Sequence, residues 1–192
     1  MGKFKRIDTS IEGLCIVEPT VFGDERGFFM ETYSKGEFAQ IGIDDVFVQD
    51  NHSLSARGVL RGLHFQRERP QGKLVRVTAG SVLDVAVDLR PGSPTYGKWE
   101  SVVLSAQNKL MLRIPPRFAH GFLALEGGTE FLYKCTELYH QASDGGVLWN
   151  DADLAVDWQL DNWGLDAAQL MISAKDLRNV AFRDFDPYTM WR

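Results

Sequence analysis

Val82-Leu83-Asp84-Val85-Ala86-Val87-Asp88 is the stretch that decides the fold class of this chain. It consists mostly of apolar and β-branched residues, and turn sequences flank it, Gly80-Ser81 before and Pro91-Gly92-Ser93-Pro94 after. Similar apolar runs recur about every ten residues, a rhythm typical of a β-sandwich or barrel. They span residues 75–77, 100–104, 110–114, 122–125 and 130–136. We expect a mainly β chain in which these runs form an antiparallel meander, with Gly127-Gly128 as a hairpin turn.

Helical signals are short and peripheral. Residues 34–41 are one candidate, because they begin with a serine that can cap a helix and are followed by glycine. A second turn is expected at residues 166–170. No repeat, low-complexity tract or linker interrupts the sequence, which predicts a single domain over residues 1–192. The aromatic residues of 181–192 are expected to pack on the barrel or on a partner subunit.

The composition limits the class of protein. The formal net charge is −5, which argues against a general nucleic-acid binder, because affinity for a polyanion comes mainly from clustered lysine and arginine. No apolar run has the length of a signal peptide or a membrane span, so no membrane partner is expected. Cys15 and Cys135 lie far apart in apolar stretches, which indicates buried free thiols. We expect a cytoplasmic protein.

One segment, residues 61–66, would place a titratable side chain inside the predicted barrel if the face with His64 is turned inward. In a regular strand its residues alternate between two faces: Arg61, Leu63 and Phe65 on one, Gly62, His64 and Gln66 on the other. An inward histidine could act as a general base, because the ordinary pKa of histidine lies near neutrality. A structural histidine that is satisfied by a neighbour explains the pattern equally well. Spacing alone leaves both interpretations of His64 open.

A second histidine, His120, lies in a context that resembles the second motif of cupins, after a strand end and Pro115-Pro116. A metal-binding cupin also needs two histidines and a glutamate in its first motif, but His64 is followed at that spacing by Gln66. Most catalytic metal sites have three or more good ligands. We therefore expect no metal.

Other polar side chains have both a functional and a plain interpretation. Lys73 begins a predicted strand and is either a solvated lysine or a cation aimed at a developing enolate oxygen. Tyr133 shares a strand face with Phe131 and Cys135, which is either core or pocket wall. Polar residues embedded in aromatic stretches suit either a nucleotide diphosphate or ion pairs at the barrel rim. They are Arg26, Glu31, Gln49 and Asn51.

Taken together, long blocks of the chain resemble the dTDP-4-dehydrorhamnose 3,5-epimerase family over nearly its whole length. The blocks are Phe22-Gly23-Asp24-Glu25-Arg26-Gly27-Phe28-Phe29, Phe47-Val48-Gln49-Asp50-Asn51-His52-Ser53, Val59-Leu60-Arg61-Gly62-Leu63-His64-Phe65-Gln66, Gln71-Gly72-Lys73-Leu74-Val75-Arg76-Val77, Asp84-Val85-Ala86-Val87-Asp88-Leu89-Arg90, Phe118-Ala119-His120-Gly121-Phe122 and Phe131-Leu132-Tyr133-Lys134. The resemblance implies a homodimeric jelly-roll β-barrel of the cupin type, with strands exchanged between subunits and no metal or other cofactor.

The resemblance also implies roles for single residues. His64 would be the general base, paired with Asp176 of Ile172-Ser173-Ala174-Lys175-Asp176, while Tyr133 would be the general acid and Lys73 would stabilise the enolate. Positions that match substrate-holding residues are Arg26, Glu31, Gln49, Asn51, Arg61, His120, Asp144 and Lys175. Departures from the family pattern are Asp144 in place of Glu, Arg117 in place of Gly and Gln159 in place of Pro.

The reaction that the resemblance implies is epimerisation at carbons beside a C4 ketone. The substrate would be dTDP-4-dehydro-6-deoxy-D-glucose and the product dTDP-4-dehydro-L-rhamnose, for dTDP-L-rhamnose biosynthesis. A dTDP-sugar epimerase that inverts only C3 or only C5, for a specialised deoxysugar pathway, is the alternative. A non-catalytic cupin that only binds a sugar nucleotide would need no acid–base set of this kind.

Overall fold

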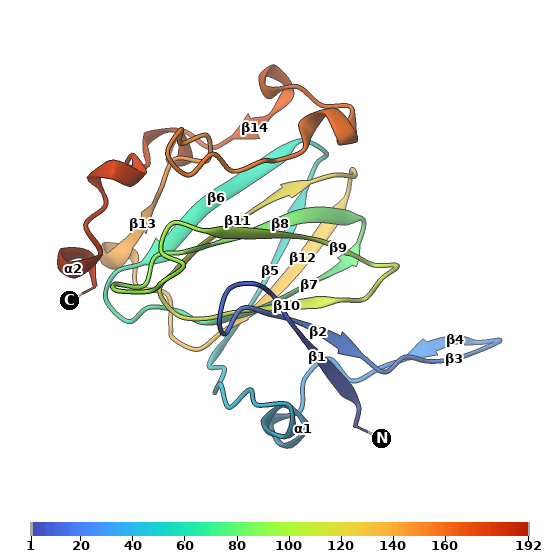
Figure 1. Ribbon diagram of the computed structural model, residues 1–192. Coiled ribbons are helices and arrows are strands. Elements are labelled where there is room, and N and C mark those ends of the chain that lie inside the picture. Colours follow the sequence, from blue (N-terminus) through green and yellow to red (C-terminus); the bar gives the residue numbers. More distant parts are fainter. Residues whose placement is uncertain (1, 192) are drawn as a thin grey trace.

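The computed structural model describes residues 2–191, so Met1 and Arg192 lie outside it. The body of the protein is built on two β-sheets that pack face to face (Figure 1). The first sheet has the order β1 (Phe4–Asp8), β2 (Cys15–Pro19), β10 (Met111–Ile114), β7 (Lys73–Ala79), β12 (Thr129–Cys135), β5 (Gln49–Ser55). The second has the order β13 (Asp144–Gly146), β6 (Val59–Gln66), β11 (Phe118–Ala124), β8 (Ser81–Asp88), β9 (Trp99–Ser105). A short strand, β14 (Met171–Ile172), pairs with β6 in parallel.

Apolar side chains from both sheets meet in the interior, which explains why the two layers stay together. Val75 and Phe131 from the first sheet pack there with Val82, Ala86 and Phe122 from the second. Burial of such side chains contributes roughly 1.5–3 kcal/mol each. The order of the strands and the two facing layers confirm the jelly-roll β fold.

The outer face of the second sheet is also covered. The chain after β13 runs over the second sheet, where Trp158, Leu165 and Phe185 pack against outward side chains of β6 and β8 (Figure 1). The expected packing of residues 181–191 is therefore confirmed for Phe182, Phe185 and Trp191. Tyr188 is different, since 72% of its surface is exposed.

The predicted meander is wrong. Strands β7 and β8 do not pair with each other: β7 lies between β10 and β12, and β8 lies between β9 and β11. Only Gly80 separates β7 from β8, and one residue is too short to reverse a strand into a hairpin, so the chain passes from one sheet to the other there. The turn at Gly127-Gly128 joins β11 to β12, which also lie in different sheets. Of the predicted neighbours, β8 and β9 do form a hairpin.

The helices are short and lie outside the sheets. Helix α1 (Lys35–Gln40) follows Ser34 as expected, although the serine side chain makes no capping hydrogen bond. At the second predicted turn, the side chain of Asp166 caps the 3₁₀ helix η3 (Ala167–Gln169). The remaining short helices are η1 (Gln141–Ser143), η2 (Leu160–Trp163), η4 (Asp176–Arg178), η5 (Phe182–Asp184) and α2 (Pro187–Met190). No helix among the described residues is long and apolar enough to cross a membrane.

A two-stranded hairpin stands apart from both sheets. It is formed by β3 (Phe22–Asp24) and β4 (Gly27–Phe29) and projects from the body at the right of Figure 1. Its aromatic side chains Phe22, Phe28 and Phe29 are 56%, 61% and 66% exposed. Cys15 and Cys135 are buried and form no disulfide bond, as predicted.

Candidate active site

Strand β6 carries the central histidine, and an irregular step in this strand sets the direction of its side chains. His64 is opposite His120 and Arg61 is opposite Phe122 on β11, with a shift of register between the two pairs. At the shift Gly62 has φ +123°, and a Cβ on it would lie 2.6 Å from the Cα of Gly121. Neither residue of this contact has room for a side chain.

The shift corrects the expected faces of this segment. Arg61 was predicted to lie on the face opposite His64, but it shares the inner face of the sheet with His64, since its partner Phe122 belongs to the interior cluster. Leu60 and Leu63 instead share the outer face of the sheet. An extra residue at a bulge changes the alternation of side chains by one position. Arg61 and His64 therefore lie on the same face of β6, where the exposed Arg61 has its guanidinium 3.3 Å from the Ser55 hydroxyl.

His64 is paired with Asp176, as predicted. Its Nε2 lies 2.6 Å from Oδ1 of Asp176, whose other oxygen accepts a hydrogen bond from the backbone N–H of Gly62. The Asp176 side chain is 4% exposed and that of His64 is 32% exposed. Burial would raise the pKa of Asp176, but the hydrogen bonds from His64, Gly62 and Ser173 outweigh it and hold the pKa below its ordinary value. An ionised Asp176 can therefore orient the imidazole and leave Nδ1 for chemistry.

The second histidine also has a carboxylate partner, which the sequence reasoning missed. Nε2 of His120 lies 3.1 and 3.0 Å from the two oxygens of Asp84 on β8. Both side chains are almost completely buried, and the ring of His120 stacks on Phe131. The signal that was available is a carboxylate in the middle of the apolar run that decides the fold.

Lys73 and Tyr133 lie on neighbouring strands of the first sheet, on the same inward face. Tyr133 is opposite Val75, Cys135 is opposite Lys73, and the Nζ of Lys73 is 5.9 Å from the centre of the Tyr133 ring. Burial lowers the pKa of Lys73, although Cys135, Asp84 and Asp144 act in the opposite direction. Burial also raises the pKa of Tyr133, so its hydroxyl keeps its proton at neutral pH.

The mouth of the interior is edged by polar groups from three segments. The Gln49 amide donates to Asn51 at 2.9 Å and accepts a hydrogen bond from the backbone N–H of Tyr139. The Tyr139 hydroxyl in turn donates to Asp144 at 2.9 Å, and Asp144 forms an ion pair with Lys175. The shorter Asp144 therefore still reaches Lys175. Tyr139 was missed, because a tyrosine in a loop carries no pattern in the sequence.

Two of the predicted substrate-holding residues are not part of this group. Arg26 lies on the projecting hairpin, where its side chain is 85% exposed and pairs with Asp24. Glu31 pairs with Lys3 near the start of the chain. Within a single chain neither residue is brought together with His64.

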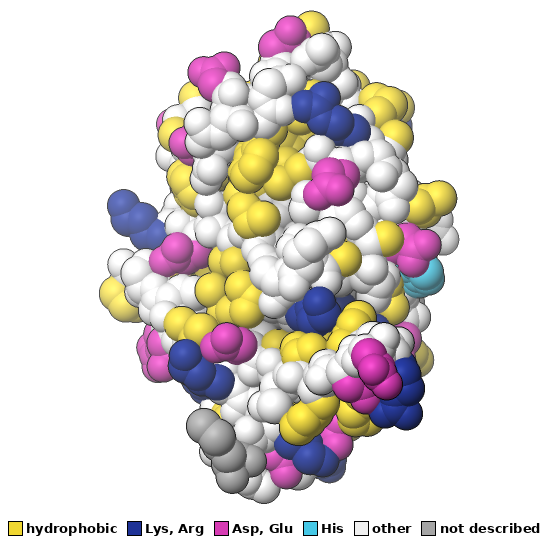
Figure 2. Space-filling view, turned by 90° about the vertical axis from the view of Figure 1, so that its right-hand side faces the viewer, with side chains coloured by type: hydrophobic (Ala, Val, Ile, Leu, Met, Phe, Trp, Pro, Cys, Tyr) yellow, Lys and Arg dark blue, Asp and Glu magenta, His cyan; other side chains and the backbone are white. Residues whose placement is uncertain are grey.

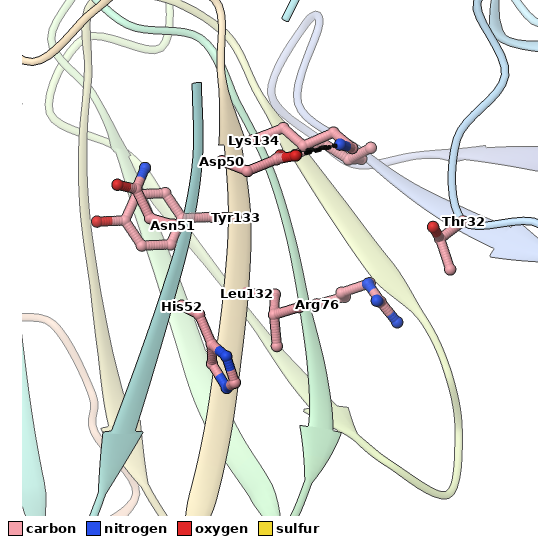
Figure 3. A pocket seen from close by; sticks show the side chains of 9 residues that line it. Thr32, Asp50, Asn51, His52, Arg76, Leu132, Tyr133 and Lys134 are labelled. Carbon is pink, nitrogen blue, oxygen red and sulfur yellow. Dashed lines mark hydrogen bonds and ion pairs between the residues drawn. The ribbon is translucent and has the colours of Figure 1, made fainter. Parts of the chain in front are cut away.

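A pocket of about 240 Å³ lies on the other side of the first sheet. Its lining residues include Arg76, Leu132 and the Lys134–Asp50 ion pair. Asn51 and Tyr133 also border it, but their side chains point to the opposite side of the strands (Figure 3). His64 and Asp176 do not line it. The candidate catalytic groups therefore gather inside the two sheets and not in this outer hollow. Among residues 2–191, no three His, Cys, Asp or Glu side chains are grouped as metal ligands.

The departures from the family pattern have visible backbone consequences. Arg117, where glycine is usual, has φ +68° in the turn before β11. Gln159, where proline is usual, has φ +53°, a value that the proline ring cannot adopt. The backbone at residue 159 therefore requires a residue other than proline.

Comparisons with known proteins point to one family. Residues 8–184 match the sequence pattern described as dTDP-4-dehydrorhamnose 3,5-epimerase. A relative of that name from Methanothermobacter thermautotrophicus is 54% identical over 176 residues, which cover 92% of this chain and 93% of the relative. One from Escherichia coli (strain K12) is 53% identical over 174 residues, which cover 90% of this chain and 91% of the relative. A crystal structure of dTDP-6-deoxy-D-glucose-3,5-epimerase from Legionella pneumophila Philadelphia 1, in complex with dTDP-4-keto-L-rhamnose, has a TM-score of 0.91 at 46% identity and covers 98% of both chains. This chain belongs to the dTDP-4-dehydrorhamnose 3,5-epimerase family.

Proposed function

We propose that this protein is a dTDP-4-dehydro-6-deoxy-D-glucose 3,5-epimerase, which inverts C3 and C5 to form dTDP-4-dehydro-L-rhamnose. The observation that carries the proposal is the 2.6 Å contact between His64 and the buried Asp176, with Lys73 and Tyr133 facing the same interior. Two groups that move protons and one fixed cation are what epimerisation beside a ketone requires. No step of this reaction calls for a metal or another cofactor.

His64 is the general base in the proposed mechanism. Nδ1 takes the proton from C3 or C5, and the electrons of that C–H bond form an enolate on the oxygen of the C4 ketone. Asp176, hydrogen-bonded to Nε2, stabilises the imidazolium that results. The ammonium group of Lys73 meets the enolate oxygen, where a preorganised charge is worth more than in water.

Tyr133 is the general acid in the same proposal. Its phenol gives a proton to the carbon from the face opposite His64, which inverts that centre. Solvent then returns a proton to the phenolate of Tyr133 and takes one from the imidazolium of His64. Because burial raises the pKa of Tyr133, the proton is present at neutral pH. Without a donor on the second face, the proton would return to the side from which it came.

The substrate is held by groups around this centre and from a second copy of the chain. Gln49, Asn51, Arg61, His120, Asp144 and Lys175 are proposed to bind the nucleotide sugar from within one subunit. Arg26 and Glu31 are proposed to act across a homodimer, because a lone two-stranded hairpin with exposed aromatics is only marginally stable in water. On the face toward which the hairpin projects, hydrophobic side chains form several patches between charged ones (Figure 2). The two buried free thiols support a cytoplasmic location.

The test is to incubate the protein with dTDP-4-keto-6-deoxyglucose in heavy water and to follow deuterium at C3 and C5 by NMR. Label at both carbons, together with the L-sugar, is the expected result. Label at one carbon would identify a 3-only or 5-only epimerase instead. A protein that binds the sugar nucleotide and incorporates no deuterium would contradict the proposed activity.

A further inference from the structure

Asp84 is a buried carboxylate for which the proposed mechanism has no use. It is 0% exposed, and His120 is the only hydrogen-bond partner of its side chain among the described residues. A buried ionised carboxylate with so few partners is costly to keep. Asp88, four residues along the same strand and also 0% exposed, differs because it accepts hydrogen bonds from Arg90, Ser93 and Thr95. Asp88 therefore anchors the loop after β8, whereas Asp84 hydrogen-bonds to one imidazole, and its charge also acts to raise the pKa of Lys73.

The position of the proton on that imidazole follows from the contact. An ionised carboxylate can only accept a hydrogen bond, so the proton of a neutral His120 ring lies on Nε2. Burial lowers the pKa of His120, and the charges of Lys73 and His64 lower it further, although Asp84 acts against them. The ring is thus neutral at neutral pH, and Nδ1 carries a lone pair. Within residues 2–191, no group hydrogen-bonds to this Nδ1.

The ring is also held in place. It stacks on Phe131, with 6.0 Å between ring centres and an angle of 23° between the planes. His120 is directly opposite His64 across β11 and β6, so the two imidazoles lie side by side at the centre of the site. His120 is too enclosed to act as a second base, because its side chain is 7% exposed against 32% for His64.

We infer that Asp84 is a positioning residue, which holds His120 with its proton on Nε2 so that Nδ1 accepts a hydrogen bond from a hydroxyl group of the sugar. This inference rests on the proposed function. A lone pair cannot bind a phosphate oxygen, which is itself only an acceptor, so the diphosphate is excluded as the partner of Nδ1. Since His120 lies beside the proposed base, the hydroxyl belongs to the reacting hexose and not to the nucleoside.

Asp84→Asn is the informative substitution, with Asp88→Asn as its matched control. The asparagine can donate to Nε2 and so move the ring proton to Nδ1, which then no longer accepts a hydrogen bond. We expect kcat/KM for the sugar substrate to fall about 10- to 100-fold. The Kd for dTDP alone should stay unchanged, because dTDP lacks the hexose. Asp88→Asn should lower the melting temperature and leave kcat/KM of the folded protein as it was.

The tautomer can be observed without substrate, in ¹⁵N-histidine NMR spectra of the free protein at pH 7. Wild type should show the His120 proton on Nε2, and the Asp84→Asn variant should show it on Nδ1. A doubly protonated His120 in wild type, or a proton on Nδ1, would overturn the inference even if the variant did not fold. The inference would also be overturned if Asp84→Asn bound dTDP more weakly, or if it lowered the melting temperature without lowering kcat/KM, as expected for Asp88→Asn. If wild type fails to convert the sugar, the proposed function fails, while the tautomer of His120 still tests the role of Asp84.

Discussion

His64 and His120 lie opposite each other, yet only His64 has the exposure that a substrate carbon requires. We expect His64→Asn to lower both turnover and solvent exchange of the sugar C–H protons by about 10²- to 10⁴-fold, because an amide cannot take up a proton at neutral pH. Deuterium incorporation followed by NMR measures both. His52→Asn is the control, since His52 points away from the interior and pairs with Glu130. Undiminished exchange by a folded His64→Asn protein would exclude His64 as the base.

Lys73 illustrates a conflict between stability and function at one side chain. Burial lowers the pKa of Lys73 in the folded protein, so holding its charge costs free energy that the unfolded chain does not spend. Lys73→Met should therefore raise the free energy of unfolding by about 1 kcal/mol while it abolishes most activity. Urea denaturation and turnover measure the two effects. Lys134→Met, on the outer face, should change stability by less than about 0.5 kcal/mol. If Lys73→Met instead lowered the free energy of unfolding, favourable interactions of the Lys73 ammonium would outweigh the cost of burying its charge.

At the scale of the element, the turn that leads into β11 carries backbone strain. Arg117 has φ +68° and an exposed side chain. Residues other than glycine adopt this left-handed conformation at a cost of about 1–2 kcal/mol. Arg117→Gly should raise the free energy of unfolding by about 0.5–1 kcal/mol, after the greater entropy of glycine in the unfolded chain is subtracted. Gln107→Gly, an exposed turn position with negative φ, should destabilise instead. If thermal melting shows that both variants lose the same stability, the backbone of the turn is not strained by Arg117.

Strand β6 shows how far a pattern of residues predicts an element. The sequence is sufficient to predict the strand and to place His64 and Gln66 on one face of it, because apolar and polar residues alternate from Leu63 to Gln66. It was insufficient for Arg61, since the register shift depends on the close approach of Gly121, a residue of another strand. The partner of His120 was missed for the same reason: Asp84 is 36 residues away, and only the sheet brings the two together.

For the whole molecule, the strands of the strongest apolar runs were predictable, whereas the remaining strands and the order of all of them in the sheets were not. Each apolar run became a strand, but turns such as Gly80 look alike in sequence whether the chain reverses within a sheet or crosses to the other one. The resemblance to a known family supplied the jelly roll. It also brought His64, Lys73, Tyr133 and Asp176 together as a set, although their contacts join segments far apart in the sequence.

A dimer with exchanged hairpins predicts that two inactive proteins can repair each other. Arg26→Ala removes the residue that the hairpin would deliver, and His64→Ala removes the base of the receiving site. Co-expression of the two variants should restore about a quarter of wild-type activity, because half of randomly paired dimers are hybrids and each hybrid has one intact site. Each variant alone sets the baseline in the same turnover assay. Sedimentation as a monomer, or no recovery in verified hybrids, would contradict the exchange.

The contact between His64 and Asp176 joins residues 112 positions apart, and this has a consequence for synthesis on the ribosome. Every strand of the two facing sheets precedes Asp176, so a nascent chain can build its β framework while this carboxylate is still to be made. Such a chain already contains His64, Lys73 and Tyr133, but the His64 imidazole lacks the carboxylate of Asp176 as its hydrogen-bond partner. The proposed base is therefore completed only late in translation. A product that terminates before residue 176 would be a nearly whole β fold without the activity.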